Sequence, residues 1–326
     1  ITPADALSFA TTGAEDHAYT ITGAGTEVIV DGEITAPGIP TPIPVQSVVS
    51  TTGSEAYAFN IIDESKLILN YADVSTTDSS KTFNITTGAS AEINNADISS
   101  GKDDSSVIYA SDKGSILTGD NIRLTSDAAQ ARGINIQSGA SASLSNINIE
   151  LTNAKHALTV SDSSLVIENL TVEQTSAGSQ NVIYASGSSD DIRATVDIIN
   201  GNVRMTGNDD IMVNTNTYSD VTLTGGTYAT TGSNNTGFFA ASQSAKLTAN
   251  DLSLTTNGMH SYAVDARGEA ELNNVSITTL GDKSYALYVA ANEATNAGLS
   301  PATLTAKNVV INTEGSSSAA AVADHA

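Results

Sequence analysis

The sequence repeats itself about every 24 residues, and this repeat limits the folds that the chain can adopt. Its clearest marker is an Asn or Asp directly before an aliphatic residue, with Gly226-Thr227 in the one gap. Two steps between markers are longer than the rest, which indicates insertions. The markers are Asp73-Val74, Asp97-Ile98, Asn121-Ile122, Asn146-Ile147, Asn169-Leu170, Asn202-Val203, Asp251-Leu252, Asn274-Val275 and Asn308-Val309.

Each repeat holds three short runs in which apolar and polar residues alternate, the pattern of β-strands. In one repeat these runs include Ile134 to Ile136, Leu144 and Ile147 to Ile149, with Ser/Gly/Ala turns between them. The pattern predicts an all-β fold, a parallel β-helix with three strands per coil and roughly 11 coils of about 24 residues. We expect right-handed coils, because the left-handed form uses strict hexapeptides, about 18 residues per coil.

The Asn/Asp marker has a structural explanation in such a fold. Asn and Asp tolerate the left-handed backbone conformation that a tight turn requires. Amides stacked on successive coils can also bond to one another along the ladder. We therefore expect the markers to form a structural ladder rather than a ligand site.

Three segments interrupt the repeat, near 36–46, 186–200 and 290–302. The first holds four of the six prolines and cannot be a central strand. Loops on a rigid scaffold often carry binding function, although a solenoid also tolerates insertions at its turns. We expect one β-helix domain over 1–326, a fragment of a longer polypeptide, since the chain begins at Ile1 and ends inside what resembles another repeat.

One row of side chains is a candidate binding surface. In the first strand of each coil, the residue between two inward apolar residues should face outward, and an exposed stripe of amides and phenols can bind sugars or a protein surface. The alternative is that Asn and Tyr simply suit a solvated sheet face. The expected row is Asn60, Asn84, Tyr109, Asn135, Thr159, Tyr184, Met212, Asp265 and Tyr288, and the candidate binding residues in it are Asn60, Asn84, Tyr109, Asn135, Tyr184 and Tyr288.

Charge and residue types argue against several classes of function. The 36 acidic and 13 basic residues give a net charge of -23, which opposes binding to nucleic acid or anionic lipid. The chain has no Cys, so thiol catalysis and thiolate metal sites are excluded. The expected row has no Arg, Lys or His and only one acid, and the four histidines show no metal spacing. We expect no enzymatic activity, no cofactor and no metal site.

Acidic residues recur at one turn and could share Ca²⁺ through carboxylate oxygens. No glycine-rich calcium repeat accompanies them, so solvated turn charge is the preferred interpretation. The residues are Asp78, Asp103, Asp104, Asp127, Asp209, Asp210 and Asp282.

The sequence resembles the passenger domains of Gram-negative autotransporters, in particular the adhesin and self-associating group. The resemblance rests on the three-strand repeat, the Ser/Thr/Asn/Gly richness, the lack of Cys and repeats such as 135–144 followed by 146–149. It implies a signal peptide and an outer-membrane barrel outside this segment, and display on the cell surface. It also implies adhesion to a host protein or glycan, or homotypic aggregation and biofilm growth. A carbohydrate-active enzyme and a passive stalk are the alternatives.

Overall fold

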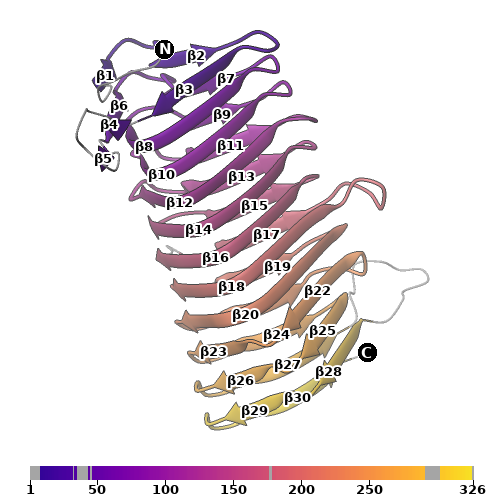
Figure 1. The fold of residues 1–326 in the computed structure, drawn as a ribbon. Helices are drawn as coiled ribbons and strands as arrows, with labels where there is room; N and C mark the ends of the chain where they lie inside the picture. Colours follow the sequence, from indigo (N-terminus) through magenta and orange to yellow (C-terminus); the bar gives the residue numbers. More distant parts are fainter. Residues whose placement is uncertain are drawn as a thin grey trace. The chain divides into compact units, whose positions relative to one another are not determined.

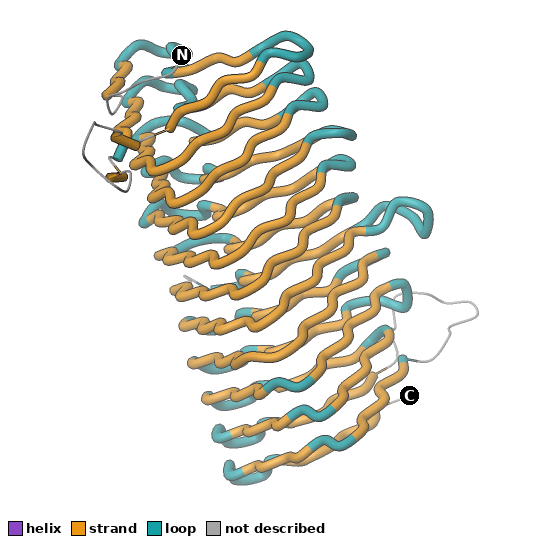
Figure 2. Tube along the Cα trace, viewed as in Figure 1, coloured by secondary structure: helices purple, strands orange, loops and turns teal. Residues whose placement is uncertain are grey.

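The computed structural model describes residues 8–31, 33–34, 43–44, 46–175, 178–290 and 302–324. It divides into two compact units, residues 1–152 and 153–326. All regular structure in the described residues is β-structure (Figures 1 and 2), so no helix there could cross a membrane. Whether 1–326 forms a single domain stays a prediction.

The first unit consists of stacked strands with parallel pairing, apart from the antiparallel hairpin of β4 and β5. Its short strands β2, β7, β9, β11 and β13 pair in that order, and we call this ladder sheet B. The strands are β1 (Ser8–Thr11), β2 (Tyr19–Ile21), β3 (Glu27–Asp31), β4 (Glu33–Ile34), β5 (Ile43–Pro44), β6 (Ser47–Thr51), β7 (Phe59–Ile61), β8 (Lys66–Thr76), β9 (Lys81–Ile85), β10 (Ser90–Ser100), β11 (Ser106–Ser111), β12 (Ile116–Ser126), β13 (Arg132–Gln137) and β14 (Ser141–Thr152).

The second unit repeats this arrangement, and its sheet B runs through β15, β17, β19, β21, β24, β27 and β30. The strands are β15 (His156–Ser161), β16 (Ser164–Thr175), β17 (Asn181–Ser186), β18 (Ala194–Thr206), β19 (Ile211–Thr215), β20 (Ser219–Thr231), β21 (Thr236–Ala240), β22 (Ala245–Asn250), β23 (Ser253–Asn257), β24 (Tyr262–Ala266), β25 (Glu269–Asn273), β26 (Ser276–Thr279), β27 (Tyr285–Ala290), β28 (Thr303–Lys307), β29 (Val310–Thr313) and β30 (Ala319–Asp324).

The predicted parallel β-helix is confirmed, with about 25 residues per turn. The second and third strands of most coils form one long strand that bends at a residue in the left-handed region. In β10 and β12 these residues are Asn95 (φ 51°) and Asn121 (φ 54°). Beyond Asp251 (φ 53°) the two parts are separate strands, such as β22 and β23. Three strands per coil are thus observed, and the coils are consistent with the expected right-handed form.

The marker alignment was wrong in three coils. Asp97 is exposed on the strand after the bend and pairs with Arg123, whereas the residue at the bend is Asn95. Asp73 and Asn202 are displaced in the same way, by two residues from Tyr71 and Asn200. Because the side-chain period of a strand is two, the displaced residues still lie on the outer face, although steps between a displaced and a correct marker are wrong by two residues.

The amide ladder at the bends is confirmed within each unit. Asn121 Nδ2 donates to Asn95 Oδ1 at 2.8 Å. In the second unit Asn274 Nδ2 donates to Asp251 Oδ1 at 2.8 Å, and Asn308 Nδ2 donates to Asn274 Oδ1 at 3.0 Å. These bonds join residues on adjacent coils, so they hold the bend in register.

The core of each unit is a column of stacked apolar side chains. Ile136, assigned inward from the sequence, is fully buried. Phe59 and Phe83 stack on adjacent coils with centroids 4.9 Å apart. Burial of this kind stabilises by about 25 cal/mol per Å² of apolar surface. The core therefore fixes which residues of each strand face outward.

Candidate functional site

The outer face of sheet B carries the predicted row. In the first unit the register aligns Asn60, Asn84, Tyr109 and Asn135, as predicted. In the second unit the aligned residues are Thr159, Tyr184, Asn214, Phe239, Asp265 and Tyr288.

Met212 was wrongly assigned to this row, and Phe239 was missed. Met212 is fully buried, because two successive inward residues, Met212 and Val213, precede the outward Asn214. The same inward pair recurs in the first unit as Val107 and Ile108. A strict alternation counted from the start of the strand therefore fails at this pair.

The amides of the row in the first unit bond mainly to their neighbours. Asn84 Nδ2 donates to Asn60 Oδ1 at 2.8 Å, and Gln137 Nε2 donates to Asn135 Oδ1 at 2.8 Å. Asn84 and Asn135 are only 7% and 4% exposed. These two candidate residues thus offer a partner little contact area, which favours a structural role for them.

In the first unit, the ammonium group of Lys81 makes cation–π contacts with two tyrosine rings. Lys81 Nζ lies 4.1 Å from the ring centroid of Tyr109 and 5.3 Å from that of Tyr57. It also donates to Asn84 Oδ1 at 3.0 Å. Burial lowers the pKa of Lys81, and the nearby Glu55 and Asp112 oppose this effect. The faces of Tyr57 and Tyr109 are therefore already in contact with a cationic side chain of the same protein.

Tyr184 is also engaged by neighbouring side chains. Its ring stacks on His156 with centroids 5.3 Å apart, and its hydroxyl accepts a bond from Asn216 Nδ2 at 3.0 Å. It is half-buried. Tyr184 is therefore held by neighbouring side chains at both its ring and its hydroxyl.

The largest aromatic group on the outer face lies near the end of the second unit. Tyr262 lies 5.1 Å from Tyr288 and 5.6 Å from Tyr285, measured between ring centroids, and all three rings are half-buried. Arg267 lies over Phe239, with its Cζ 5.5 Å from the ring centroid. We call this group the tyrosine–arginine cluster: Phe239, Tyr262, Asp265, Arg267, Tyr285 and Tyr288.

Asp265 is an unusual carboxylate for an outer face, because its side chain is only 5% exposed. Arg267 Nε and Nη2 donate to its two oxygens at 3.3 and 3.2 Å. Burial raises the pKa of Asp265, although Arg267 acts in the opposite direction. Burial and then Asp265 raise the pKa of Tyr262. Perturbed groups that gather on a surface in this way mark a candidate functional site.

Sequence reasoning found only Asp265 and Tyr288 of this cluster. A signal for Tyr262 and Tyr285 existed in the repeated Ser-Tyr-Ala, at Ser261 to Ala263 and again at Ser284 to Ala286. The register pairs Tyr262 with Tyr285 directly. The same tripeptide at the same place in successive coils therefore puts two phenol rings side by side.

The second insertion forms a loop at the edge of this face. Because β18 begins at Ala194, the extra residues are 187–193, a shorter segment than the predicted 186–200. A hairpin-like bridge joins Ser189 and Ile192. Ile192 is 51% exposed, so the loop presents an apolar side chain.

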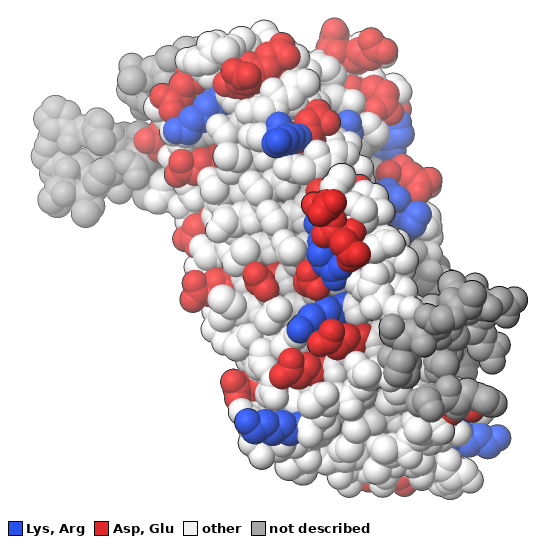
Figure 3. All heavy atoms as spheres, turned by 90° about the vertical axis from the view of Figure 1, so that its right-hand side faces the viewer, with Lys and Arg blue, Asp and Glu red and all other residues white. Residues whose placement is uncertain are grey.

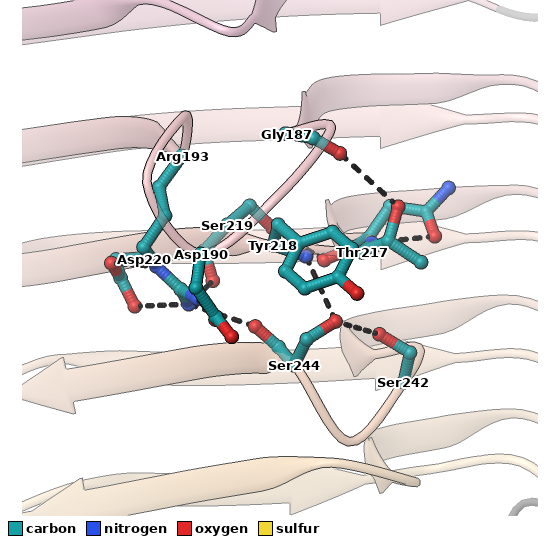
Figure 4. Close-up of polar contacts among 10 residues, drawn as sticks. Gly187, Asp190, Arg193, Thr217, Tyr218, Ser219, Asp220, Ser242 and Ser244 are labelled. Atoms are coloured by element: carbon teal, nitrogen blue, oxygen red, sulfur yellow. Dashed lines mark hydrogen bonds and ion pairs between the residues drawn. The ribbon is translucent and has the colours of Figure 1, made fainter.

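Arg193 anchors this loop (Figure 4). Its Nε and Nη2 donate to Asp220 at 2.7 and 2.8 Å, and Nη2 also reaches the Ser244 carbonyl at 2.7 Å. Nη1 donates to Asp190 within the loop at 3.0 Å. At the other end, a Cβ on Gly187 would overlap the Tyr218 carbonyl oxygen. Both ends of the loop are therefore fixed.

The other two predicted insertions fall almost wholly outside the described residues. Of 36–46, the structure describes only the strand β5 and residue 46, and of 290–302 only Ala290 and Ala302.

Two of the recurring acidic residues at the turns accept hydrogen bonds from the backbone of the next coil. Asp103 Oδ1 accepts a bond from the Ala129 amide at 2.8 Å, and Asp282 Oδ1 accepts one from the Ser316 amide at 2.7 Å. The described residues contain no group of three or more acidic or histidine side chains placed to bind a metal ion.

Two shallow hollows lie at the bends of the first unit. The larger, of about 310 Å³, is lined by the amides of Asn95, Asn121, Asn146 and Asn148 together with Asp97 and Arg123, and has Ala96 and Ile122 in its wall. The second, of about 200 Å³, also includes Asp97 and Arg123. On the face of the molecule in Figure 3 most side chains are uncharged, and the basic ones lie beside acidic ones.

Comparison with known proteins shows the fold but not a sequence family. No family model matches the chain, and no curated protein matches it. A solved structure, the cryo-EM structure of the Vag8–C1 inhibitor complex, matches with a TM-score of 0.66 and 14% identity. The match covers 98% of this chain and 77% of the other. Vag8 is an autotransporter passenger, so the similarity supports a passenger-like fold.

Proposed function

We propose that this chain is a cell-surface passenger of the adhesin type that binds a partner protein through the tyrosine–arginine cluster. The observation that carries the proposal is the composition and packing of this cluster. Tyr and Arg are the residues most enriched at the energetic centres of protein interfaces. Half-buried rings lose little conformational entropy when a partner covers them, so they contribute more to affinity than mobile side chains.

The comparison supports a protein partner. The Vag8 structure is a complex with C1 inhibitor, so a solenoid of this fold can present a protein-binding face. The net charge of -23 favours a partner surface that is neutral or basic. In this proposal the chain is extracellular and its partner is a host surface protein.

Homotypic association between cells, with aggregation and biofilm growth, is the second arrangement that this face supports. Two copies at -23 repel each other, so the contact depends on short-range packing and hydrogen bonds. At 0.15 M, added salt screens this repulsion between charges that are more than about 8 Å apart. Aggregation that survives or strengthens as salt rises to that concentration fits this arrangement, and aggregation that disappears does not.

A carbohydrate-active enzyme remains the alternative, because Arg123 and Asp97 line a hollow together. We propose that no catalysis occurs there. Glu150 raises the pKa of Arg123 through a hydrogen bond and through its charge. A lyase base must be deprotonated, and this shift keeps the guanidinium charged.

The test displays the chain on cells that do not aggregate and scores settling and adherence to protein-coated and glycan-coated wells. One variant replaces Tyr262, Tyr285 and Tyr288 with Ser. Since these rings would supply the buried contact area, we expect loss of adherence with unchanged β-sheet circular dichroism.

A matched variant changes the predicted row outside the cluster, with Asn60, Asn84, Asn135 and Tyr184 replaced by Ser. These residues bond mainly to one another and to neighbours, so the matched variant should adhere like the wild type. Loss of adherence in the matched variant and not in the tyrosine variant would place the function on the row instead.

A further inference from the structure

We propose that the two hollows at the bends of the first unit form one groove that binds a neutral polysaccharide chain. The hollows share Asp97 and Arg123, so they adjoin. The residues that line them come from successive coils, because Asp73 pairs with Asp97 and Asp97 pairs with Arg123. Coils repeat at the strand spacing of about 4.8 Å, so the groove offers similar groups at regular steps along its length.

The exposed lining of the groove is polar and planar. Amide, carboxyl and guanidinium groups face the solvent there, whereas Ala96 and Ile122 lie behind them and are nearly fully buried. The hydroxyl groups of a sugar ring both donate and accept hydrogen bonds, so they match these groups.

The groove also has hydrogen-bonding capacity that the described residues do not use. Arg123 binds Glu150 through Nε at 3.3 Å and Nη2 at 2.8 Å, and its Nη1 makes no hydrogen bond among the described residues. The exposed carboxylates of Asp73 and Asp97 accept none there either. The groove therefore holds one fixed donor beside two free acceptors.

The charges select for an uncharged chain. Glu150 already pairs with Arg123, so the unpaired carboxylates of Asp73 and Asp97 dominate the groove. A polyanionic glycan would approach these carboxylates against the field of a chain at -23. Neutral hydroxyl groups can donate to them without this penalty.

The experiment measures binding of the whole chain to immobilised dextran, xyloglucan and arabinogalactan, with heparin and alginate as anionic probes. Arg123→Gln removes the fixed donor. Ser99 lines the second hollow, so Ser99→Trp fills it without removing a charged group. We expect binding to at least one neutral polysaccharide, and a loss of about tenfold or more in each variant, as for one lost charged hydrogen bond.

Arg204→Gln is the matched control, because Arg204 is an exposed arginine on a strand of the second unit. It should bind like the wild type, and circular dichroism and melting temperature identify any variant that fails to fold. The triple Ser variant of Tyr262, Tyr285 and Tyr288 should also keep its glycan binding, which separates this site from the protein-binding cluster.

Several results would overturn the proposal. They are an absence of binding to all three neutral polysaccharides, equal binding by the wild type, Arg123→Gln and Ser99→Trp, and a preference for heparin or alginate. Binding of an extended peptide in place of the polysaccharides, lost in the same variants, would assign the groove to a different class of ligand.

Discussion

Tyr228 and Gly201 form a size-matched pair in the core of the second unit, and this pair gives a sharp test of the packing. Tyr228 is only 1% exposed, and its hydroxyl makes no hydrogen bond among the described residues. Burial raises the pKa of this phenol far above its ordinary value. A Cβ on Gly201 would overlap the Tyr228 hydroxyl and lie 2.8 Å from its Cζ. Gly201 therefore provides the space that the phenol fills.

Each substitution has an expected size. Gly201→Ala inserts a methyl group into filled space, which costs about 1–3 kcal/mol of unfolding free energy. A buried hydroxyl without a hydrogen-bond partner destabilises the folded protein by about 1–3 kcal/mol. Tyr228→Phe removes this hydroxyl, so the variant should be as stable as the wild type or more stable. Tyr228→Leu loses the edge-to-face contact with Phe238, at 5.4 Å between centroids, and should be destabilised.

The decisive quantity is the coupling between the two positions. Leu is shorter than Tyr, so Gly201→Ala should cost at least about 1 kcal/mol less in the Tyr228→Leu background than in the wild type. Amide hydrogen exchange in β18 and β20 measures this free energy locally, which suits a solenoid whose coils can open separately.

Two outcomes would refute the packing described here. One is additivity of Gly201→Ala and Tyr228→Leu. The other is a loss of more than about 1 kcal/mol in Tyr228→Phe, which would mean that the hydroxyl has a hydrogen-bond partner.

Other predictions concern charge and burial. Asp265 has a raised pKa, so the stability that it contributes is present below pH 3.8 and falls as pH rises through the raised pKa. In urea unfolding, Asp265→Asn should therefore be more stable than the wild type at pH 7. This difference in unfolding free energy should shrink as pH falls toward the ordinary pKa of 3.8. Burial lowers the pKa of His17, which accepts a bond from the Tyr57 amide at 3.0 Å. The stability from the neutral imidazole is present above pH 6.5 and is lost as pH falls through the lowered pKa. Acid should therefore reduce the protection of that amide, measured as its exchange rate relative to the intrinsic rate at the same pH, but not in His17→Gln, where no imidazole titrates. Ile136→Asp should cost several kcal/mol and lower the melting temperature, because it buries an unpaired carboxylate. Arg193→Ala should make the loop 187–193 sensitive to limited proteolysis, whereas equal resistance would show that the Arg193 contacts do not hold it.

The fold followed from the sequence because a parallel ladder requires coils of nearly equal length. The alternation of Ile134 to Ile136 and Ile147 to Ile149 was enough to give strands, and the bend needed only residues that tolerate positive φ. The exact bend residue did not follow. Tyr71 is at a bend with φ 54°, and no propensity rule selects Tyr for that position.

The candidate site followed only in part, because it depends on the inward pair of residues in sheet B. Strict alternation placed Tyr109 and Tyr288 correctly on the outer face, but it also predicted an exposed Met212, which is buried. The same inward pair separates Tyr285 from Tyr288 by three residues and still leaves both on the outer face. A pattern of period two has no place for two such residues on one face, so the cluster could not be assembled from it.

Contacts between coils, rather than within one coil, build the tyrosine–arginine cluster. Tyr262 reaches Tyr285 and Tyr288 because the ladder places β24 beside β27, far apart in the sequence. A residue added inside either strand would move its side chains to the other face. A residue added between strands leaves the register unchanged: the loop 187–193 separates β17 from β18, yet Tyr184 still pairs with Asn214. A solenoid can therefore gain loops at its turns while the outer face of its sheet keeps its geometry.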